Sequence, residues 1–577
     1  MKKTSHIKSL PPPLNRRQAL NRLTISGVAS FGFLSYTQKI SAAILQPNDE
    51  TVPDPTETNT DAHRWRPNLH FTASKGFMND PCGLIFDGKF YHLYYQFNPK
   101  SPQAGEPSWG HAISEDLYHW KDCPIAIAAD KTGMIFTGSA VIDEKNSSGL
   151  FKDSPQKNLV VFYTKATEKS QSQWLAWSSD GGLHYQNYAK NPVVDAGHNS
   201  FRDPKVFWHE PSKKWIMTVV EASKKRVSLY GSYDLISWMH LSNFGPSGLF
   251  GTEWECPNLV ELEIENETNP DGSPKTCWVF FVSINPGAPL GGSSTQYFLG
   301  QFDGERFTRK SAGVGVVDFA KDNYALQFYN HFPNHEKVYL GWFGNWQYCE
   351  ELPTKEWNGA MTLPRKATLR RNADKFLSLI QKPLGLEALR EAKIDIQFPE
   401  SQKNTWLLSA LKRRQLKPYE NFHATLPNET AVEFLMDVVV EERGVRNPDG
   451  ASGRAGRVII ELTNALAEKL SLGFDAASCQ FWVDRSELRG FHHPFFTGSF
   501  SVALPKDSQQ FSLRLILDGC TLEVYINDGE DVGTFLLYPY HPLTTLTIGA
   551  TNATLTLDKL ELYRLKRTMN RPHFSSP

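Results

Sequence analysis

The chain has 577 residues, which is too long for one ordinary domain, and a prior of roughly 100–200 residues per domain favours two or three of them. Its charge is balanced, with 61 Lys and Arg against 62 Asp and Glu, and this argues against a polyanion-binding surface because nucleic-acid affinity depends on concentrated cationic charge. The 7 cysteines are scattered without paired metal spacing, so we expect neither a disulfide framework nor a metal site.

Residues 1–43 have the features of an export signal. A basic start precedes a mildly apolar stretch from Leu23 to Tyr36, which is too short to span a bilayer at roughly 20 apolar residues. Ser41-Ala42-Ala43 then offers small residues suited to signal peptidase. The run from Asn15 to Leu20 (NRRQAL) resembles a twin-arginine signal, with a Sec signal or an uncleaved anchor as the alternatives. We therefore predict a secreted or periplasmic protein, in which the polar, Pro-rich residues 44–64 form a flexible spacer.

After Trp65, short runs rich in Val, Ile, Phe, Tyr and Trp alternate with Gly, Asp, Asn and Pro, which predicts an all-β chain. A loose repeat accompanies them, in which a strand, a tight turn and an aromatic residue follow one another. The turn aspartates of this repeat are Asp116, Asp180, Asp234 and Asp303. Their intervals leave room for four strands per unit, which is typical of propeller blades. Residues 65–380 would hold five such units and are predicted to form a β-propeller.

The remainder of the chain predicts a second β domain. Residues 381–393 contain one short helical stretch after a Pro-Gly break and are interpreted as a linker. Strands resume from about Ile394, separated by turn signals such as Asn527-Asp528-Gly529. Residues 394–577 are therefore predicted to form a C-terminal antiparallel β-sandwich.

Three segments place a carboxylate at a strand end: FMNDPCGL (77–84), FRDPKVF (201–207) and EWECPNL (253–259). Each alone has a plain interpretation, because Asp-Pro commonly initiates turns. Cleavage of a glycosidic bond, however, needs one carboxylate as a nucleophile and one protonated carboxyl as an acid. Different blades would supply such groups to one axial pocket, so the candidate catalytic residues are Asp80, Asp203 and Glu255.

These three motifs resemble, in this order, those of glycoside hydrolase family 32, the β-fructofuranosidases. Further matching segments are FYHLYYQFNP (90–99), WGHAISEDLYHW (109–120), FTGSA (136–140), NPGAPLGGSSTQYFLGQFDG (285–304), GWFGNWQY (341–348) and LEVYINDG (522–529). The resemblance covers nearly the whole exported chain. It implies a five-bladed β-propeller followed by a C-terminal β-sandwich, and it implies no cofactor.

The resemblance also implies the role of each carboxylate. Asp80 would be the nucleophile, which suits a group with backbone N–H donors nearby. Glu255 would be the acid/base and has to be protonated before the attack. Asp203 would hold fructose hydroxyls and stabilise the oxocarbenium-like transition state. A retaining mechanism follows, with the Asp80 and Glu255 carboxyls roughly 5–5.5 Å apart.

The matched motifs further imply the residues that bind fructose. This interpretation is favoured over a structural one for Asn79, Gln96 and Trp109. It is left open against a structural one for Phe136, Ser139 and Trp346. Arg202 is counted with them, and its place next to Asp203 suggests that it keeps that carboxylate charged.

Three departures from the family pattern stand out. Cys82 replaces the usual Asn beside the nucleophile and predicts sensitivity to mercurials, although we interpret it as a small packing residue. Ala320 and Asn323 stand where the family usually has Gly and Phe, which weakens the assignment of any role to Tyr324. The segment Asp484-Arg485-Ser486 answers to a family motif without any chemistry attached.

Two alternative functions stay open at this point. A fructosyltransferase uses the same triad and passes the fructosyl group to a sugar instead of water. A non-catalytic fructan-binding protein would be expected to lack Asp80 or Glu255, and both are present. Residues 285–304 look more like those of microbial exo-levanases and exo-inulinases than of plant invertases, which implies release of terminal fructose from levan or inulin, with sucrose also cleaved. We expect a monomer or weak homo-oligomer that has no nucleic-acid partner and no membrane association after signal removal. We also expect the sandwich to brace the propeller rather than to bind fructan.

Overall fold

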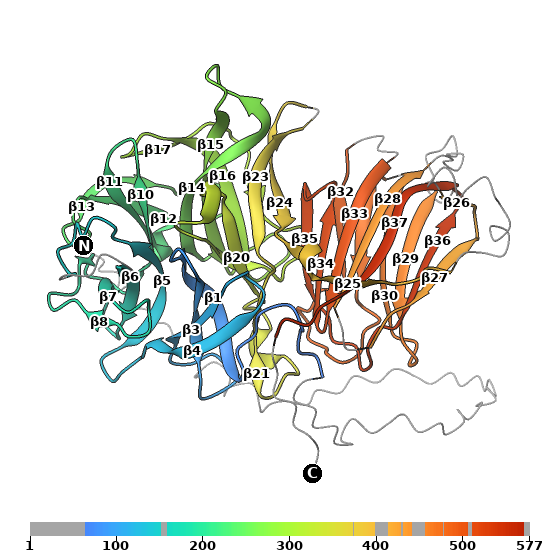
Figure 1. Cartoon of the computed structure of the whole chain (residues 1–577), viewed down its shortest axis with the longest axis horizontal. Coiled ribbons are helices and arrows are strands. Elements are labelled where there is room, and N and C mark those ends of the chain that lie inside the picture. Colours follow the sequence, from blue (N-terminus) through green and yellow to red (C-terminus); the bar gives the residue numbers. More distant parts are fainter. Residues whose placement is uncertain are drawn as a thin grey trace, which may run out of the picture. The chain divides into compact units, whose positions relative to one another are not determined.

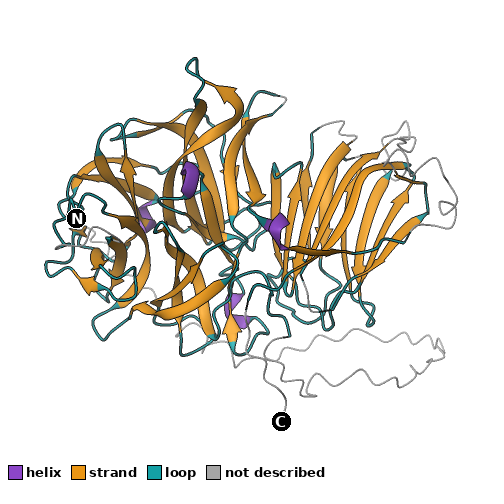
Figure 2. Ribbon diagram, in the orientation of Figure 1, coloured by secondary structure: helices purple, strands orange, loops and turns teal. Residues whose placement is uncertain are grey.

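The computed structural model describes residues 64–151, 158–372, 374–397, 414–428, 431–440, 456–476, 478–505 and 510–569, all within one compact unit. Figure 2 shows that strands dominate this part of the chain. The helical elements in it are four short 3-10 turns: η1 (Ala222–Lys224), η2 (Pro333–His335), η3 (Cys349–Glu351) and η4 (Leu386–Leu389). Within these described ranges no helix is long and apolar enough to cross a membrane. The predicted export signal and the spacer up to residue 63 lie outside the described residues.

Five antiparallel blades follow one another along the first part of the chain (Figure 1). The first consists of β1 (Gly76–Phe86), β2 (Tyr91–Asn98), β3 (Ser108–Ser114) and β4 (Trp120–Ile127). The second consists of β5 (Met134–Ile142), β6 (Leu159–Ala166), β7 (Gln171–Ser178) and the short β8 (Gln186–Asn187) and β9 (Val194–Asp195). The third consists of β10 (Phe201–His209), β11 (Lys214–Glu221), β12 (Arg226–Ser232) and β13 (Met239–Phe244).

The fourth and fifth blades are joined by a parallel bridge between Ile264 and Leu369. The fourth consists of β14 (Glu253–Thr268), β15 (Pro274–Asn285), β16 (Ser294–Phe302), β17 (Phe307–Arg309) and β18 (Gly315–Val316). The fifth consists of β19 (Tyr324–Phe328), β20 (Val338–Phe343), β22 (Ala360–Met361), β23 (Arg365–Arg371) and β24 (Leu377–Pro383). The short β21 (Trp357–Asn358) pairs in parallel with β1, which links the last blade to the first.

The innermost strands of the five blades form a closed ring. Each contacts the next, from β1 to β5, β10, β14 and β19, and β19 contacts β1 again. Every one of them carries a register shift in its pairing with the second strand of its blade. The shifts fall between Met78 and Pro81, Phe136 and Gly138, Arg202 and Lys205, Glu255 and Asn258, and Tyr324 and Gln327. Because a bulge re-aims the side chains beside it, this ring turns selected residues of all five blades toward one region.

The repeat seen in the sequence is the turn between the third and fourth strands of four blades. In the first blade the Asp116 carboxylate accepts hydrogen bonds from the backbone N–H groups of Tyr118 and His119, at 3.0 and 2.8 Å. The same turn is closed at Asp180, Asp234 and Asp303. Asp side chains favour such turns because they bond their own backbone a few residues on. The prediction of a propeller is confirmed.

The second part of the chain is a sandwich of two antiparallel sheets, drawn in orange to red in Figure 1. One sheet consists of β25 (Arg390–Lys393), β26 (Arg414–Leu416), β28 (Val432–Val440), β33 (Gln510–Asp518), β34 (Thr521–Ile526), β35 (Asp531–Leu536) and β37 (Leu555–Leu565). The other consists of β27 (Asn421–Thr425), β29 (Arg457–Thr463), β30 (Lys469–Asp475), β31 (Gln480–Asp484), β32 (Ser499–Ala503) and β36 (Thr545–Thr551). The connection from the propeller is shorter than expected from the sequence, since Gln381 lies in β24 and Arg390 begins β25.

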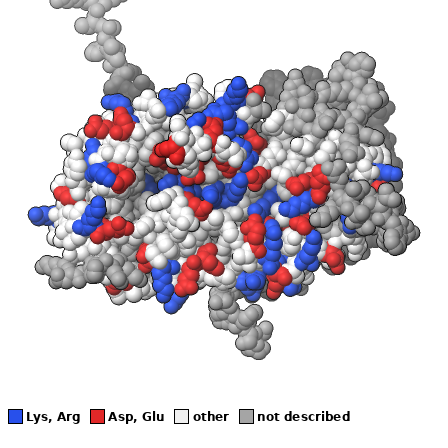
Figure 3. All heavy atoms as spheres, turned by 45° about the horizontal axis from the view of Figure 1, so that its top comes forward, with Lys and Arg blue, Asp and Glu red and all other residues white. Residues whose placement is uncertain are grey.

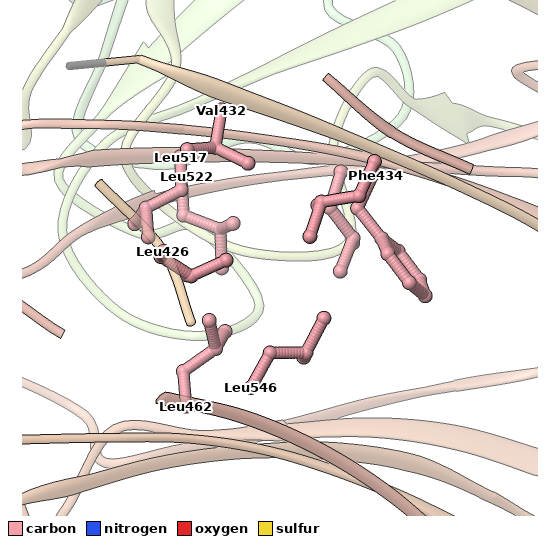
Figure 4. Close-up of a pocket in the computed structure, with 9 residues that line it drawn as sticks. Leu426, Val432, Phe434, Leu462, Leu517, Leu522 and Leu546 are labelled. Carbon is pink, nitrogen blue, oxygen red and sulfur yellow. The ribbon is translucent and has the colours of Figure 1, made fainter. Parts of the chain in front are cut away.

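A small cavity of about 20 Å³ lies inside the sandwich (Figure 4). Its walls are apolar and include Leu426, Val432, Phe434, Leu462, Leu517, Leu522 and Leu546. A buried water needs two to four polar partners, so such a cavity stays dry. It is an imperfection of core packing and offers no group for chemistry.

Candidate active site

Asp80, Asp203 and Glu255 come together at the bulges of β1, β10 and β14. Cys256, next to Glu255 in the chain, connects the other two: its backbone N–H donates to Asp203 Oδ2 at 2.9 Å, and its Sγ lies 3.4 Å from Asp80 Oδ2. Asp80 is far from the other two residues in the chain, but all three lie on strands of the inner ring, in which β10 and β14 are neighbours. The three candidate catalytic carboxylates therefore share one site.

The backbone at this site is held in unusual conformations. Asp203 has φ 65°, Cys256 has φ 47° and Ala325, next to Tyr324, has φ 53°. Non-glycine residues in this left-handed region cost on the order of 1–3 kcal/mol each and cluster at functional sites. At Asp203 the conformation is secured by its backbone N–H, which donates to the Thr164 hydroxyl at 2.9 Å.

The Asp80 carboxylate is buried and bonded by side chains, where backbone donors were expected. Oδ1 accepts a hydrogen bond from the Asn79 amide at 3.0 Å, and Oδ2 accepts one from the Thr137 hydroxyl at 2.8 Å. Burial, reinforced by the negative charge of Glu255, raises the pKa of Asp80 to about 6, although these donors and Cys256 oppose the rise. Burial thus disfavours the charged form of the Asp80 carboxylate, while the neighbouring donors stabilise it. Such a carboxylate suits a nucleophile.

Thr137 was missed in the sequence, although its neighbours Phe136 and Ser139 were selected. Gln96 on β2 donates its amide N–H to the Thr137 oxygen, so the Thr137 proton is committed to Asp80. Gln96 is thus connected to the candidate nucleophile through Thr137. A Thr in a strand gives no signal by itself, and it faces the site because the bulge between Phe136 and Gly138 turns it.

Arg202 contacts Glu255 rather than its sequence neighbour Asp203. Its Nη2 donates to Glu255 Oε1 at 3.0 Å and also to Glu253, which lies two residues earlier on β14. Burial raises the pKa of Asp203, the positive charge of Arg202 opposes that rise, and the negative charge of Glu255 adds to it. The net effect is a pKa of about 7 for Asp203, so Arg202 favours the charged form through space without outweighing burial, and its guanidinium is bonded to the two glutamates.

Tyr324 lies on the other side of the Glu255 carboxyl. Its hydroxyl donates a hydrogen bond to Glu255 Oε2, and its side chain is fully buried. Ala320 and Asn323, which depart from the family pattern, had weakened the assignment of any role to this residue. The structure nevertheless places it on the candidate acid/base, with Arg202 on the other carboxyl oxygen.

Two of the predicted binding residues have structural roles instead. Trp109 is fully buried, and its indole N–H donates to the Phe136 carbonyl at 2.9 Å, so no ring face is left for a sugar. The Ser139 hydroxyl donates to the Pro204 carbonyl at 2.8 Å and accepts from the Val206 N–H at 2.9 Å, which ties β5 to β10. The prediction that Trp109 contacts fructose is therefore corrected, and for Ser139, where both interpretations were open, the contacts favour the structural one. Motif matches do not distinguish contact from support.

Phe136 and Trp346 are better placed for a pocket wall, since each is only partly buried. The Trp346 ring packs against Phe77 and Trp342, with ring centroids 6.0 and 5.0 Å apart. Cys82, in contrast, is fully buried beneath Asp80, with its Sγ 3.4 Å from the Asp80 carbonyl oxygen. This matches the interpretation of Cys82 as a packing residue.

Among the described residues no group of three or more His, Cys, Asp or Glu is arranged to hold a metal ion. The face shown in Figure 3 carries acidic and basic side chains interspersed with one another. The titratable groups that the site brings together are its own carboxyls. One buried carboxylate and one carboxyl held between a guanidinium and a phenol are the groups that glycosidic bond cleavage requires.

The chain matches two models of one known protein family. The family model for the glycosyl hydrolases family 32 N-terminal domain matches residues 70–383, and the model for the glycosyl hydrolases family 32 C-terminal domain matches residues 385–564. An extracellular exo-inulinase of Meyerozyma guilliermondii is 38% identical over 521 residues, which span 87% of this chain and 95% of that protein.

Other relatives cover similar lengths. Invertase 2 of Saccharomyces cerevisiae is 35% identical over 86% of this chain and 93% of its own length. A levanase of Bacillus subtilis is 33% identical over 89% of this chain and 72% of its own length. The solved structure of a β-fructofuranosidase from Schwanniomyces occidentalis, complexed with fructosyl-erythritol, superposes with a TM-score of 0.78 at 34% identity, over 88% of this chain and 99% of that one.

Proposed function

Because the chain belongs to glycoside hydrolase family 32, we propose that it is an exported β-fructofuranosidase that releases terminal fructose from inulin, levan and sucrose. The exo-inulinase, the invertase and the levanase among its relatives support these substrates. The extracellular relative supports export, and the basic and apolar pattern of residues 1–43 supports a cleaved signal of the twin-arginine type.

In the proposed reaction Asp80 attacks the anomeric carbon of the terminal fructose. Glu255 gives its proton to the leaving oxygen as the glycosidic bond breaks, so a fructosyl ester of Asp80 and a free hydroxyl on the leaving sugar are formed. Glu255, now a carboxylate, takes a proton from water, and the resulting oxygen nucleophile displaces Asp80. Two displacements at the same carbon retain its configuration.

One observation carries this proposal: Cys256 contacts Asp80 and Asp203 at once, while Glu255 precedes it in the chain. These contacts support the proposal that Asp80, Asp203 and Glu255 act together as nucleophile, stabiliser and acid. Asn79 donates a hydrogen bond to Asp80, and Gln96 is connected to Asp80 through Thr137. We propose that these two residues bind fructose hydroxyls together with Arg202, Phe136 and Trp346. For Asp203 we propose hydrogen bonds to fructose hydroxyls during the transition state.

Product analysis on inulin, levan and sucrose tests the proposal. We expect fructose as the sole early product from both polymers, and fructose plus glucose from sucrose. Asp80→Ala and Glu255→Ala should abolish turnover on all three. Early oligosaccharides from levan or inulin would show internal cleavage, and full activity of Asp80→Ala would remove the assigned nucleophile. Longer products from concentrated sucrose would indicate that transfer to sugar competes with hydrolysis.

A further inference from the structure

The segment that leads into Tyr324 is held by the sandwich rather than by the propeller alone. In this segment, residues 318–322, the backbone N–H groups of Phe319 and Asp322 donate to carbonyls of β35, at 2.9 and 3.3 Å. Two residues later the chain enters β19, where the Tyr324 hydroxyl meets Glu255. The position of this hydroxyl therefore depends on how firmly Asp322 is fixed.

Asp322 is fixed by a buried ion pair with Arg485 of the sandwich. Arg485 Nη1 lies 2.7 Å from Asp322 Oδ2, and both side chains are 0% exposed. The same oxygen accepts the backbone N–H of Leu536 at 2.9 Å, and Oδ1 accepts the hydroxyl of Tyr348. Without solvent to screen them, the two charges hold each other firmly, and removing either one leaves an unpaired buried charge.

Arg485 is rigid on its own side of the interface. Its Nε donates to the Thr497 carbonyl at 2.9 Å and its Nη1 also donates to the Leu536 carbonyl at 2.6 Å. The guanidinium carbon lies 3.6 Å from the ring centroid of Phe496, a cation–π contact. Because its position is fixed by these groups, Arg485 acts as an anchor for Asp322 and does not follow it.

We propose that Arg485 is a positioning residue for the reaction: through Asp322 it holds the Tyr324 hydroxyl on the Glu255 carboxyl. This inference rests on the proposed role of Glu255 as the acid/base. It gives the sandwich a part in proton transfer that goes beyond bracing the propeller. Displacement of a supporting group by about 1 Å can cost on the order of 100-fold in rate. Loss of the Arg485 anchor should therefore have a measurable effect on the reaction rate.

Two substrates with different leaving groups test the proposal. The leaving oxygen of sucrose has to be protonated, whereas fluoride departs from β-D-fructofuranosyl fluoride without a proton. Loss of acid catalysis therefore slows the cleavage of sucrose selectively. For Arg485→Met we expect kcat/KM on sucrose to fall by about 10-fold or more, and kcat/KM on the fluoride to fall by less than about 3-fold. Tyr324→Phe should change the ratio in the same direction, and the double variant should lose no more than the worse single one, because both act through one contact.

Asp518→Asn is the matched control, because Asp518 and His70 form another fully buried pair between propeller and sandwich, at 2.9 Å. It should lower the unfolding temperature as Arg485→Met does and leave the ratio of the two substrates unchanged. Arg485→Lys should restore part of the ratio. Tyr348→Phe removes only the hydroxyl that donates a hydrogen bond to Asp322. If Arg485→Met does not fold, Tyr348→Phe takes its place in the comparison.

The outcomes separate three cases. A shifted ratio in Arg485→Met or Tyr348→Phe, with an unshifted ratio in Asp518→Asn, supports the positioning role. A wild-type ratio in both Arg485→Met and Tyr348→Phe, alongside a shifted ratio in Tyr324→Phe, overturns it and leaves Arg485 a purely structural residue. If Glu255→Gln itself leaves the ratio unshifted, the acid/base assignment fails first, and the positioning role fails with it.

Discussion

The Thr137 hydroxyl donates a hydrogen bond of 2.8 Å to the Asp80 carboxylate, across the boundary between the second blade and the first. Its oxygen accepts the amide of Gln96, which orients the hydroxyl so that the proton points to the carboxylate. The charged form of Asp80 is stabilised by this bond, because a donor to a carboxylate favours ionisation. A residue of the second blade thus lowers the pKa of the proposed nucleophile on the first.

Thr137→Val should therefore shift the acidic limb of the pH–rate profile to higher pH. A hydrogen bond to a charged group contributes about 1.5–3 kcal/mol, which corresponds to a rise of about 1–2 units in the pKa of Asp80. The measurement is kcat/KM on sucrose between acid and neutral pH. Thr362→Val serves as the matched control, since its hydroxyl accepts a backbone N–H from Gly341 and contacts no carboxylate. An unchanged acidic limb in Thr137→Val would show that the bond does not stabilise the charged nucleophile.

The pKa of Asp80 itself makes two further predictions, one for activity and one for stability. Since attack requires the carboxylate and its pKa is raised to about 6, kcat/KM should fall about tenfold per pH unit below that value. The folded protein holds this proton more tightly than the unfolded chain does, with its ordinary pKa of 3.8. Its contribution to stability is therefore lost as the pH rises from 3.8 to about 6.

Asp80→Asn isolates this effect on stability. The variant should be inactive, yet it should be more stable than the wild type at pH 7, by about 1–3 kcal/mol, because no charge is buried. At pH 4 the difference should be much smaller. Thermal unfolding at the two pH values measures it. Equal differences at both pH values would mean that burial does not raise the pKa of Asp80.

The sequence predicted the fold well because the signals of a propeller are local. The turn aspartates, such as Asp116, bond their own backbone and need no distant partner. Motifs in the sequence identified the catalytic candidates Asp80, Asp203 and Glu255. The bulges that bring these residues together lie in the same strands as the motifs. What a single strand encodes is therefore visible in its own residues.

Contacts between strands were much harder to predict. Trp109 and Ser139 belong to matching motifs, but whether they contact sugar or support the backbone depends on Phe136 and Pro204, which reach them only in the fold. Tyr324 was doubted because of Asn323, yet the two side chains act separately. The Asn323 amide lies against Gly341, where both of its polar atoms are buried without a hydrogen-bond partner in the described part of the chain.

The two cysteines beside the nucleophile should differ in their effect on activity. The Cys256 thiol lies on the Asp80 carboxylate and opposes the rise of its pKa, whereas the Cys82 thiol lies on the Asp80 backbone carbonyl. Cys256→Ala should raise the pH of the acidic limb, by less than Thr137→Val does, and Cys82→Ala should leave it in place. The pH–rate profiles of the two alanine variants form their own matched pair. Identical profiles would show that the thiol of Cys256 has no part in tuning Asp80.

His70 should make the contact between propeller and sandwich sensitive to alkaline pH. Burial lowers the pKa of this imidazole, but hydrogen bonds to Asp518 and Glu523, and the charges of both, outweigh burial and raise the pKa to about 9. Because the folded pKa exceeds the ordinary value of 6.5, the stabilisation is complete below that pH and is lost as the pH rises through about 9.

Asp518→Asn should remove most of this dependence and lower the free energy of unfolding at pH 6 by about 3–5 kcal/mol, since it leaves a buried charge with one partner fewer. Thermal unfolding followed from pH 6 to pH 10 measures both effects. The wild type should lose stability over this interval while the variant, already weakened, changes little. A variant that declines with pH as steeply as the wild type would place the titrating group elsewhere than at His70.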